Sequence, residues 1–291
     1  MSTSICIVKS WKANSFAEHG LARAQQWLAP PDPYLNLWKS QKLRLANTGK
    51  WYLEGAQYQA WKAGGVPFTW LYGSAGSGKT ILSAGIIDDL QKHCADDPAK
   101  CLAIFFFDFT DAEKQDPTNM VKSLLGQLLS GCTHVPEVVR SLQNTCENGG
   151  RQASEQQLLQ ALSETLDLLP ESFVVLDALD ECGDWDTLFD LLAEMQSWSK
   201  HNLRVLMTSR KEVQIQEALE DYVSLANTIC LESHLVDKDI RTYVKERMAK
   251  DKSFKRWQKD AEIRAEIETT VGRKAHGMYG SPTLHMNVES F

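Results

Sequence analysis

The stretch Gly73–Thr80, with the sequence GSAGSGKT, matches the phosphate-binding pattern G-x-x-x-x-G-K-[ST]. Its context fits: the apolar run Phe68–Tyr72 predicts a buried strand before it, and Thr80–His93 predicts a helix with one apolar face after it. Glycines allow backbone N–H groups to close around a phosphate, and the helix N-terminus adds its positive end. The alternative, a glycine-rich turn that caps an ordinary helix, is disfavoured by the flanking strand and helix.

The side chains at the end of this stretch have distinct predicted roles. Lys79 can reach the β- and γ-phosphate oxygens of a nucleotide, and Thr80 can ligate Mg²⁺. The residues expected to surround the phosphates are Gly73, Ser74, Ala75, Gly76, Ser77, Gly78, Lys79 and Thr80.

Working outward, a second buried strand ends in acidic residues. The apolar run Phe173–Leu176 leads into Asp177, and Asp180 and Glu181 follow. Ligands of parallel sheets bind outside the carboxyl ends of the strands, so Asp177 is expected beside the phosphate loop, where it holds Mg²⁺ through water. A simple polar loop is the alternative, and the upstream phosphate loop disfavours it.

A third run, Arg204–Thr208, predicts a strand that ends in Ser209 and Arg210. An arginine at the end of a strand adjacent to the phosphate-loop strand can sense a γ-phosphate. The alternative is a surface arginine in an ion pair, and the sequence leaves both interpretations open.

Further elements follow from the spacing of apolar residues. A short helix at Gly20–Leu28 is ended by Pro30, Pro31 and Pro33. The remaining expected elements are strands at Cys101–Phe107 and Thr228–Leu231, helices from Thr118 and at Glu137–Thr145, Glu155–Leu168 and Trp185–Trp198, and charged helices at Asp237–Asp251 and Asp260–Lys274. The carboxylates of the loop Asp108–Asp116 are interpreted as a solvated surface rather than a metal site.

An aromatic segment precedes the first strand. Its side chains Trp51, Tyr52, Tyr58 and Trp61 can anchor the segment to the core, which is the favoured interpretation, or stack on an adenine.

Charge and cysteine usage exclude several classes of function. The chain of 291 residues has 31 Lys+Arg against 38 Asp+Glu, a net charge of −7, and no basic block, which argues against general binding of nucleic acid or acidic membranes. Its 7 scattered cysteines have no C-x-x-C spacing and are typical of reduced thiols. Neither a membrane span nor a secretory signal is recognisable. We therefore expect a cytoplasmic protein.

Together these motifs resemble the NACHT branch of the STAND signalling NTPases, most closely the nephrocystin-type N-terminal module of fungal NACHT proteins. The resemblance runs from about Trp27 to Tyr279. It rests on WLAPPDP (27–33), TGKWYLEG (48–55), GSAGSGKT (73–80), FFFDFTD (105–111), VVLDALDEC (174–182) and LMTSR (206–210). The small residue Ala178 directly after the Mg²⁺ aspartate, with two acids beyond it, is the most specific feature.

The resemblance implies an α/β fold of the P-loop NTPase type, a three-layer sandwich with a parallel sheet in the order 2-3-4-1-5, followed by a partial helical subdomain. We divide the chain into a leader with a short helix and a proline-rich linker (1–46), the nucleotide-binding domain (47–232), the partial helical subdomain (233–279) and a frayed tail (280–291). Effector and repeat domains usual in the family are not recognisable, so the chain resembles a truncated member.

The implied function is a signalling switch that binds ATP or ADP with Mg²⁺ and hydrolyses slowly, in defence or cell-death signalling. Faster relatives carry a glutamate where this chain has Ala178, so Asp180 or Glu181 must position the attacking water. The residues do not separate ATP from GTP, and adenine comes from the resemblance. The alternative is a weakly hydrolysing interaction module. Expected partners are the nucleotide, a second copy or longer NACHT relatives, with no nucleic acid.

Overall fold

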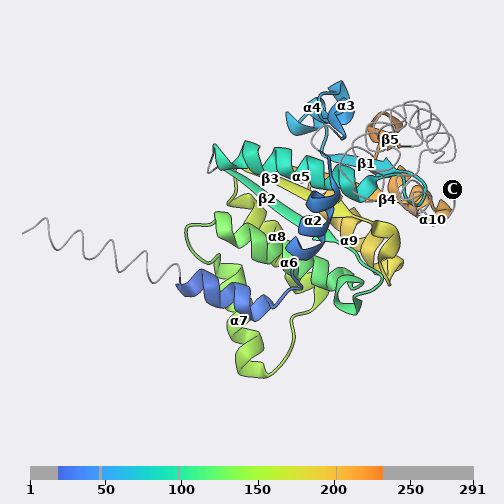
Figure 1. Cartoon of the computed structure of the whole chain (residues 1–291). Helices are drawn as coiled ribbons and strands as arrows, with labels where there is room; N and C mark the ends of the chain where they lie inside the picture. Colours follow the sequence, from blue (N-terminus) through green and yellow to red (C-terminus); the bar gives the residue numbers. More distant parts are fainter. Residues whose placement is uncertain (1–18, 46–47, 98, 201, 232–291) are drawn as a thin grey trace, which may run out of the picture. The chain divides into compact units, whose positions relative to one another are not determined.

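The computed structural model describes residues 19–45, 48–97, 99–200 and 202–231 (Figure 1). The helical subdomain and the tail expected at 233–279 and 280–291 lie outside the described residues, as do the first 18 residues of the leader. None of the described helices is both long enough and apolar enough to cross a membrane.

Five strands form one sheet in the order β2-β3-β4-β1-β5. Their bounds are β1 Phe68–Tyr72, β2 Lys100–Phe106, β3 Glu171–Asp177, β4 Leu203–Ser209 and β5 Thr228–Cys230. Strands β1 to β4 are mostly buried, as their apolar composition predicts for strands covered on both faces, whereas only Ile229 is buried in β5. The predicted α/β class and the parallel strand order are thereby confirmed.

The helices alternate with these strands along the chain (Figure 1). Residues 19–28 are helical, as predicted from their apolar spacing. The other helices are α2 Tyr34–Leu43, α3 Lys50–Leu53, α4 Ala56–Lys62, α5 Lys79–Ala95, α6 Pro117–Leu128, α7 Glu137–Gly149, α8 Glu155–Asp167, α9 Trp185–Ser197 and α10 Val213–Glu220.

Helix α2 is an element that the sequence did not reveal. The prolines before it indicated only the end of the first helix. In the structure the Asp32 side chain accepts a hydrogen bond from the backbone N–H of Tyr34 at 2.8 Å, so the proline-rich turn also begins a helix.

The chain divides into two compact units. Of the described residues, the first unit holds those up to Leu35, Leu90–Leu176 and Glu181–Val205. The second holds Asn36–Asp89, Asp177–Asp180 and those from Leu206 onward.

In the first unit, α6 packs on β2 and on α8, and α7 packs on α8. Local sequence explains where α6 begins, because Asp116 caps its N-terminus and Pro117 occupies its first position. The side-chain amide of Gln127 on α6 bonds both backbone groups of Ile104, accepting from the N–H at 3.0 Å and donating to the oxygen at 2.8 Å. Since β2 is an edge strand, Gln127 provides partners that a neighbouring strand would otherwise supply.

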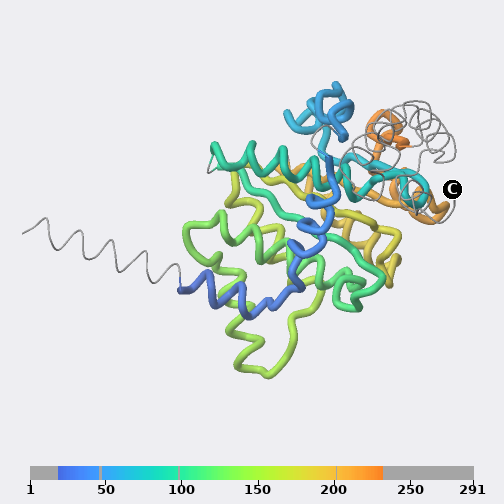
Figure 2. Tube along the Cα trace, in the orientation of Figure 1, coloured from blue at the N-terminus to red at the C-terminus, as the bar shows by residue number. Residues whose placement is uncertain are grey.

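In the second unit, β1 and β5 run parallel, with Trp70 opposite Thr228 and Tyr72 opposite Cys230. They are far apart in sequence and lie side by side in the trace of Figure 2, in cyan and orange. The first part of α5 leaves the end of β1 through the loop Gly73–Gly78. This strand, loop and helix are the context that the phosphate-binding pattern requires.

Candidate functional site

The loop Gly73–Gly78 depends on glycine at three positions. Gly76 and Gly78 have φ angles of 76° and 89°, in the left-handed region that side chains disfavour. At Gly73 a Cβ atom would lie 2.6 Å from Oγ of Ser77, so no larger residue fits. The loop therefore has the tight backbone path that brings N–H groups to a phosphate.

Lys79 begins α5 and its side chain folds back over this loop. Its Nζ donates hydrogen bonds to the backbone oxygens of Gly73 and Ser74, both at 2.8 Å. The ammonium group thus lies against the loop backbone, within the same unit as Thr80, Asp177 and Arg210.

Asp177, at the end of β3, is the centre of a buried hydrogen-bond network. Its side chain accepts from Thr80 at 2.7 Å, from Ser83 at 2.5 Å and from Thr208 at 2.7 Å. Thr80 and Ser83 lie one turn apart on α5, and Thr208 lies near the end of β4. The strand-end carboxylate and the hydroxyl of the phosphate-binding pattern are therefore in direct contact, as the sequence interpretation requires.

The electrostatics of Asp177 reflect this burial. Loss of hydration raises the pKa of its carboxyl, because Asp177 is only 2% exposed. The hydroxyl donors and the positive charge of Lys79 act in the opposite direction on the same pKa. A cation beside this carboxylate would add to the opposing effect.

The residue after Asp177 has an unusual backbone conformation. Ala178 has φ of 59° although it is not glycine. Its N–H donates to Oγ1 of Thr208 at 3.1 Å, so one hydroxyl holds both Ala178 and Asp177. A small side chain at this position is consistent with the left-handed backbone.

Asp180 and Arg210 contact each other. Oδ1 of Asp180 accepts from the backbone N–H of Arg210 at 2.8 Å, and Oδ2 lies 3.0 Å from Nε. The ion pair that the sequence left open for Arg210 is thus present, and its role in sensing a γ-phosphate stays a prediction.

Glu181 belongs to the first unit and has a different partner. Its Oε2 accepts from the backbone N–H of Phe109 at 3.1 Å. The water-positioning role expected for Asp180 or Glu181 remains a prediction, and the two side chains differ in what holds them.

The aromatic residues before β1 serve mainly the core. Tyr52, Tyr58 and Trp61 are between 0% and 2% exposed, and Tyr58 donates to Asp89 at 2.5 Å. The interpretation of these three as anchors is confirmed.

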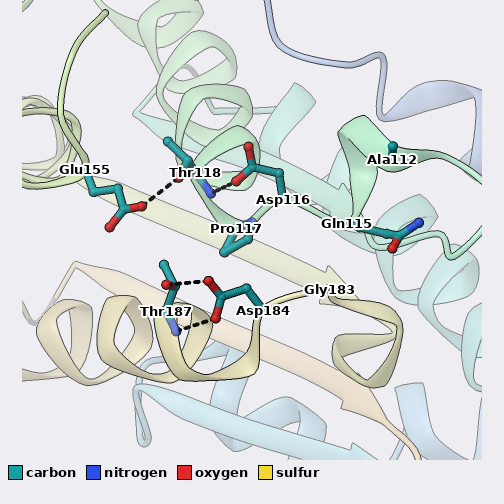
Figure 3. Close-up of a pocket in the computed structure, with 9 residues that line it drawn as sticks. All are labelled: Ala112, Gln115, Asp116, Pro117, Thr118, Glu155, Gly183, Asp184 and Thr187. Atoms are coloured by element: carbon teal, nitrogen blue, oxygen red, sulfur yellow. Dashed lines mark hydrogen bonds between the residues drawn. The ribbon is translucent and has the colours of Figure 1, made fainter.

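A cavity of about 290 Å³ lies in the first unit, away from the phosphate loop in the sequence (Figure 3). Two of its carboxylates cap helices: Asp116 accepts from the N–H of Thr118, and Asp184 accepts from the N–H and the hydroxyl of Thr187. The third, Glu155, accepts from the hydroxyl of Thr118. Among the described residues no group of three or more His, Cys, Asp or Glu side chains is arranged to hold a metal ion. The acidic side chains here therefore have structural partners.

Two residues of the network were not predicted. Ser83 and Thr208 lie 94 and 31 residues from Asp177 in the sequence, and only the fold brings them together. The run LMTSR contains Thr208, but a threonine near a strand end has no local signal that marks it as a partner of Asp177.

The residues fit a nucleotide with Mg²⁺. The loop has the glycine-dependent backbone, and Thr80 and Asp177 together offer the hard oxygen ligands that Mg²⁺ prefers. Mg²⁺ is commonly held by one or two protein oxygens with the substrate phosphates, so a larger ligand cluster is not required.

Comparison with known proteins agrees with this geometry. The family model described as Nephrocystin 3, N-terminal matches residues 47–210, more than half of the chain. The vegetative incompatibility protein HET-E-1 of Podospora anserina is 25% identical over 239 residues, which are 79% of this chain and 17% of that protein. The chain thus spans less than a fifth of this relative's length.

Among solved structures, Drosophila ORC bound to DNA aligns with 15% identity, a TM-score of 0.46, and coverage of 85% of this chain and 58% of that chain. The Aeropyrum pernix ORC1 protein in complex with DNA aligns with 14% identity, a TM-score of 0.42, and coverage of 75% and 59%. The match over 47–210 includes the phosphate loop, Asp177 and the end of β4. This chain therefore belongs to the Nephrocystin 3, N-terminal family, the NACHT-type module that its motifs resemble.

Proposed function

We propose that the protein binds ATP or ADP with Mg²⁺ and acts as a slowly hydrolysing, nucleotide-dependent switch. The observation that carries this proposal is the 2.7 Å contact between Thr80 and Asp177 at the start of α5. It unites the hydroxyl of the phosphate-binding pattern with a strand-end carboxylate, which are the two protein groups used for Mg²⁺ in P-loop sites.

Each group has a proposed task. The backbone of Gly73–Thr80 surrounds the phosphates, Lys79 neutralises their charge, and Arg210 reads the γ-phosphate. Thr80 and Asp177 hold Mg²⁺, which supplies charge neutralisation between the phosphates when bound. The assignment of adenine over guanine follows the family resemblance.

Slow hydrolysis is proposed because no acid directly follows Asp177. That position is Ala178, while Asp180 and Glu181 accept hydrogen bonds from Arg210 and Phe109. A general base must reach the attacking water, and an acid engaged elsewhere does so less readily. We expect a steady-state rate below about one per second, and a faster rate would contradict the switch.

Thermal unfolding of the purified chain with and without Mg²⁺-ADP or Mg²⁺-ATP tests binding. A ligand at a hundredfold excess over its dissociation constant adds about 2.7 kcal/mol to the stability of the binding state. The Lys79→Ala variant should lose this shift. Lys92→Ala removes the same charge from an exposed position in the last turn of α5 and should keep it.

If neither nucleotide stabilises the wild type, the proposed function is wrong. If Lys79→Ala responds as the wild type does, binding occurs elsewhere than the phosphate loop.

We also propose that the switch acts in a signalling process in the cytoplasm, of the kind that the name vegetative incompatibility protein gives to its relative. Such a switch is expected to associate with itself or with longer NACHT proteins when it holds ATP. Light scattering of the chain with ADP and with a non-hydrolysable ATP analogue tests self-association. If the mass is the same with both nucleotides, and also when a longer relative is added, the proposed association is wrong. We keep 47–232 as the proposed nucleotide-binding domain.

A further inference from the structure

The end of β4 lies against the first residue of the phosphate loop. The backbone N–H of Gly73 donates to the oxygen of Ser209 at 3.3 Å, and Nε1 of Trp70 donates to Oγ of Ser209 at 2.8 Å. On the other side of Arg210, Nζ of Lys211 lies 5.1 Å from the centre of the Tyr72 ring. Arg210 therefore lies between Ser209 and Lys211, and both of these residues contact the segment that leads into the phosphate loop.

The contact between Asp180 and Arg210 uses only some of the donors of the arginine. Asp180 contacts the backbone N–H and the Nε of Arg210, and neither contact uses the terminal Nη groups. Among the described residues, the terminal Nη groups have no ion pair or hydrogen bond. The Asp180 side chain is 7% exposed and the Arg210 side chain 47%. A nearly buried carboxylate thus holds Nε of Arg210, and the terminal Nη groups belong to a side chain that is about half exposed.

From this geometry we propose that Asp180 is a positioning residue that orients Arg210 toward the terminal phosphate and so sets the preference for a triphosphate over a diphosphate. The inference rests on the proposed function and deepens it. An exposed arginine has many rotamers, and ordering it on binding costs affinity. Holding Nε in advance removes part of that cost, and the planar fork can then bind phosphate oxygens through two N–H groups.

Two other roles for Asp180 give different results in an experiment. If Asp180 competes with the phosphate for Arg210, its removal should strengthen binding of the triphosphate. If Asp180 acts directly on metal or water, its removal should matter whether or not Arg210 is present. The contact through Nε rather than through the fork favours positioning over competition.

The experiment compares the dissociation constants of Mg²⁺-ADP and of a non-hydrolysable ATP analogue by isothermal titration calorimetry. It uses the full chain as wild type, Asp180→Ala, Arg210→Ala and the double variant. Asp180→Ala should reduce the preference for the analogue by about three- to tenfold, the scale of ordering one long side chain. Arg210→Ala should reduce it at least as much, and the double variant no further than Arg210→Ala.

Two further variants separate positioning from folding and from net charge. Asp180→Asn keeps one of the two acceptor oxygens that face Arg210 and should recover part of the preference. Glu212→Ala removes the same charge two residues from Arg210, from an exposed side chain that makes no helix-cap bond, and should leave the preference at the wild-type value. Since both nucleotides are measured on each folded protein, a general loss of stability does not alter their ratio.

The outcomes are distinct. Failure of the wild type to bind either nucleotide would overturn the proposed function and this inference with it. Binding with an unchanged or increased preference in Asp180→Ala, or an added loss in the double variant, would overturn the positioning role alone.

Discussion

At the scale of single residues, the hydroxyl of Thr208 makes two buried hydrogen bonds in the site. It donates to Asp177 and accepts from the N–H of Ala178. Replacing Thr208 with valine keeps the shape but leaves a buried N–H without its acceptor and a buried carboxylate with one donor fewer. We expect a loss of about 1–3 kcal/mol in the free energy of unfolding, measured by urea denaturation.

A matched control for Thr208→Val is Thr165→Val. Thr165 is equally buried, but its hydroxyl only bonds the backbone oxygen of Ala161 within its own helix. This oxygen has a helical partner as well, so the loss there should be smaller. Equal losses in the free energy of unfolding at the two threonines would show that the hydrogen bonds of Thr208 around Asp177 add no further stability.

Ala178 makes a second prediction about single residues. A β-branched side chain is strained at a φ of 59°, and it would have little room because Ala178 is only 7% exposed. Ala178→Val should therefore destabilise the protein by about 2 kcal/mol or more. Ala178→Gly should change stability by less than about 1 kcal/mol, because relief of strain offsets the greater freedom of the unfolded chain. Equal melting temperatures for the Ala178→Val and Ala178→Gly variants would refute the role of the left-handed backbone.

At the scale of elements, the end of α2 meets α5 through Arg44. Its Nη1 lies 2.7 Å from Asp88, and a Cβ atom on Gly85 would lie 2.9 Å from its Nε. Gly85 thus leaves room for the guanidinium to lie across the helix that begins with Lys79. Glycine inside a helix otherwise costs about 1 kcal/mol relative to alanine.

A double-mutant cycle measures this packing. In the Arg44→Ala background, Gly85→Ala should stabilise the protein by about 1 kcal/mol, because the Cβ then has space. In the wild type the same change should gain less or destabilise, with a coupling of about 0.5–3 kcal/mol in unfolding experiments. The packing argument is wrong if Gly85→Ala has the same effect in both backgrounds.

The same elements show what the sequence could predict. The bounds predicted for the first strand, Phe68–Tyr72, are those observed for β1, because its apolar run is bounded by the glycine loop. The strand predicted at Phe173–Leu176 begins two residues earlier and includes Asp177, since polar ends are invisible to an apolar pattern. The phosphate-binding pattern Gly73–Thr80 could be recognised because it is contiguous in the sequence, whereas the role of Thr80 and Asp177 as metal ligands stays a prediction.

Contacts between distant segments escaped prediction for a physical reason. The sequence offered Asp180 and Glu181 as equivalent acids, whereas their partners, Arg210 and Phe109, are set by the path of strands 30 and 72 residues away. Serine and threonine hydroxyls, such as that of Thr208, occur in many roles, so no local signal marked it as a partner of Asp177.

At the scale of the whole molecule, alkaline pH should weaken the fold. Burial raises the pKa of Cys132 and of Cys182 from 9.0 to about 11. The unfolded chain therefore loses these protons at lower pH than the folded chain does. The stability from the buried thiols is fully present below pH 9 and is lost as the pH rises from 9 to 11.

Melting temperatures between pH 8 and pH 10.5 test this. The Cys182→Ser variant should lose less stability over that range than the wild type, because its hydroxyl does not titrate. Buried tyrosines such as Tyr52 also have a raised pKa, but they act equally in both proteins, so the difference isolates Cys182. Parallel pH profiles would contradict the assigned shift.

The side chain of Gln127 has a consequence for how the protein survives in concentrated solution. The strand that it covers, β2, contains the run CLAIFF, an apolar and β-prone segment of the type that seeds aggregation. Because Gln127 is on α6, opening of that helix would leave the backbone N–H and oxygen of Ile104 without these two partners. We therefore expect aggregation to depend on the opening of α6, so a variant that stabilises the packing of α6 on β2 should stay in solution longer than one equally stabilised elsewhere.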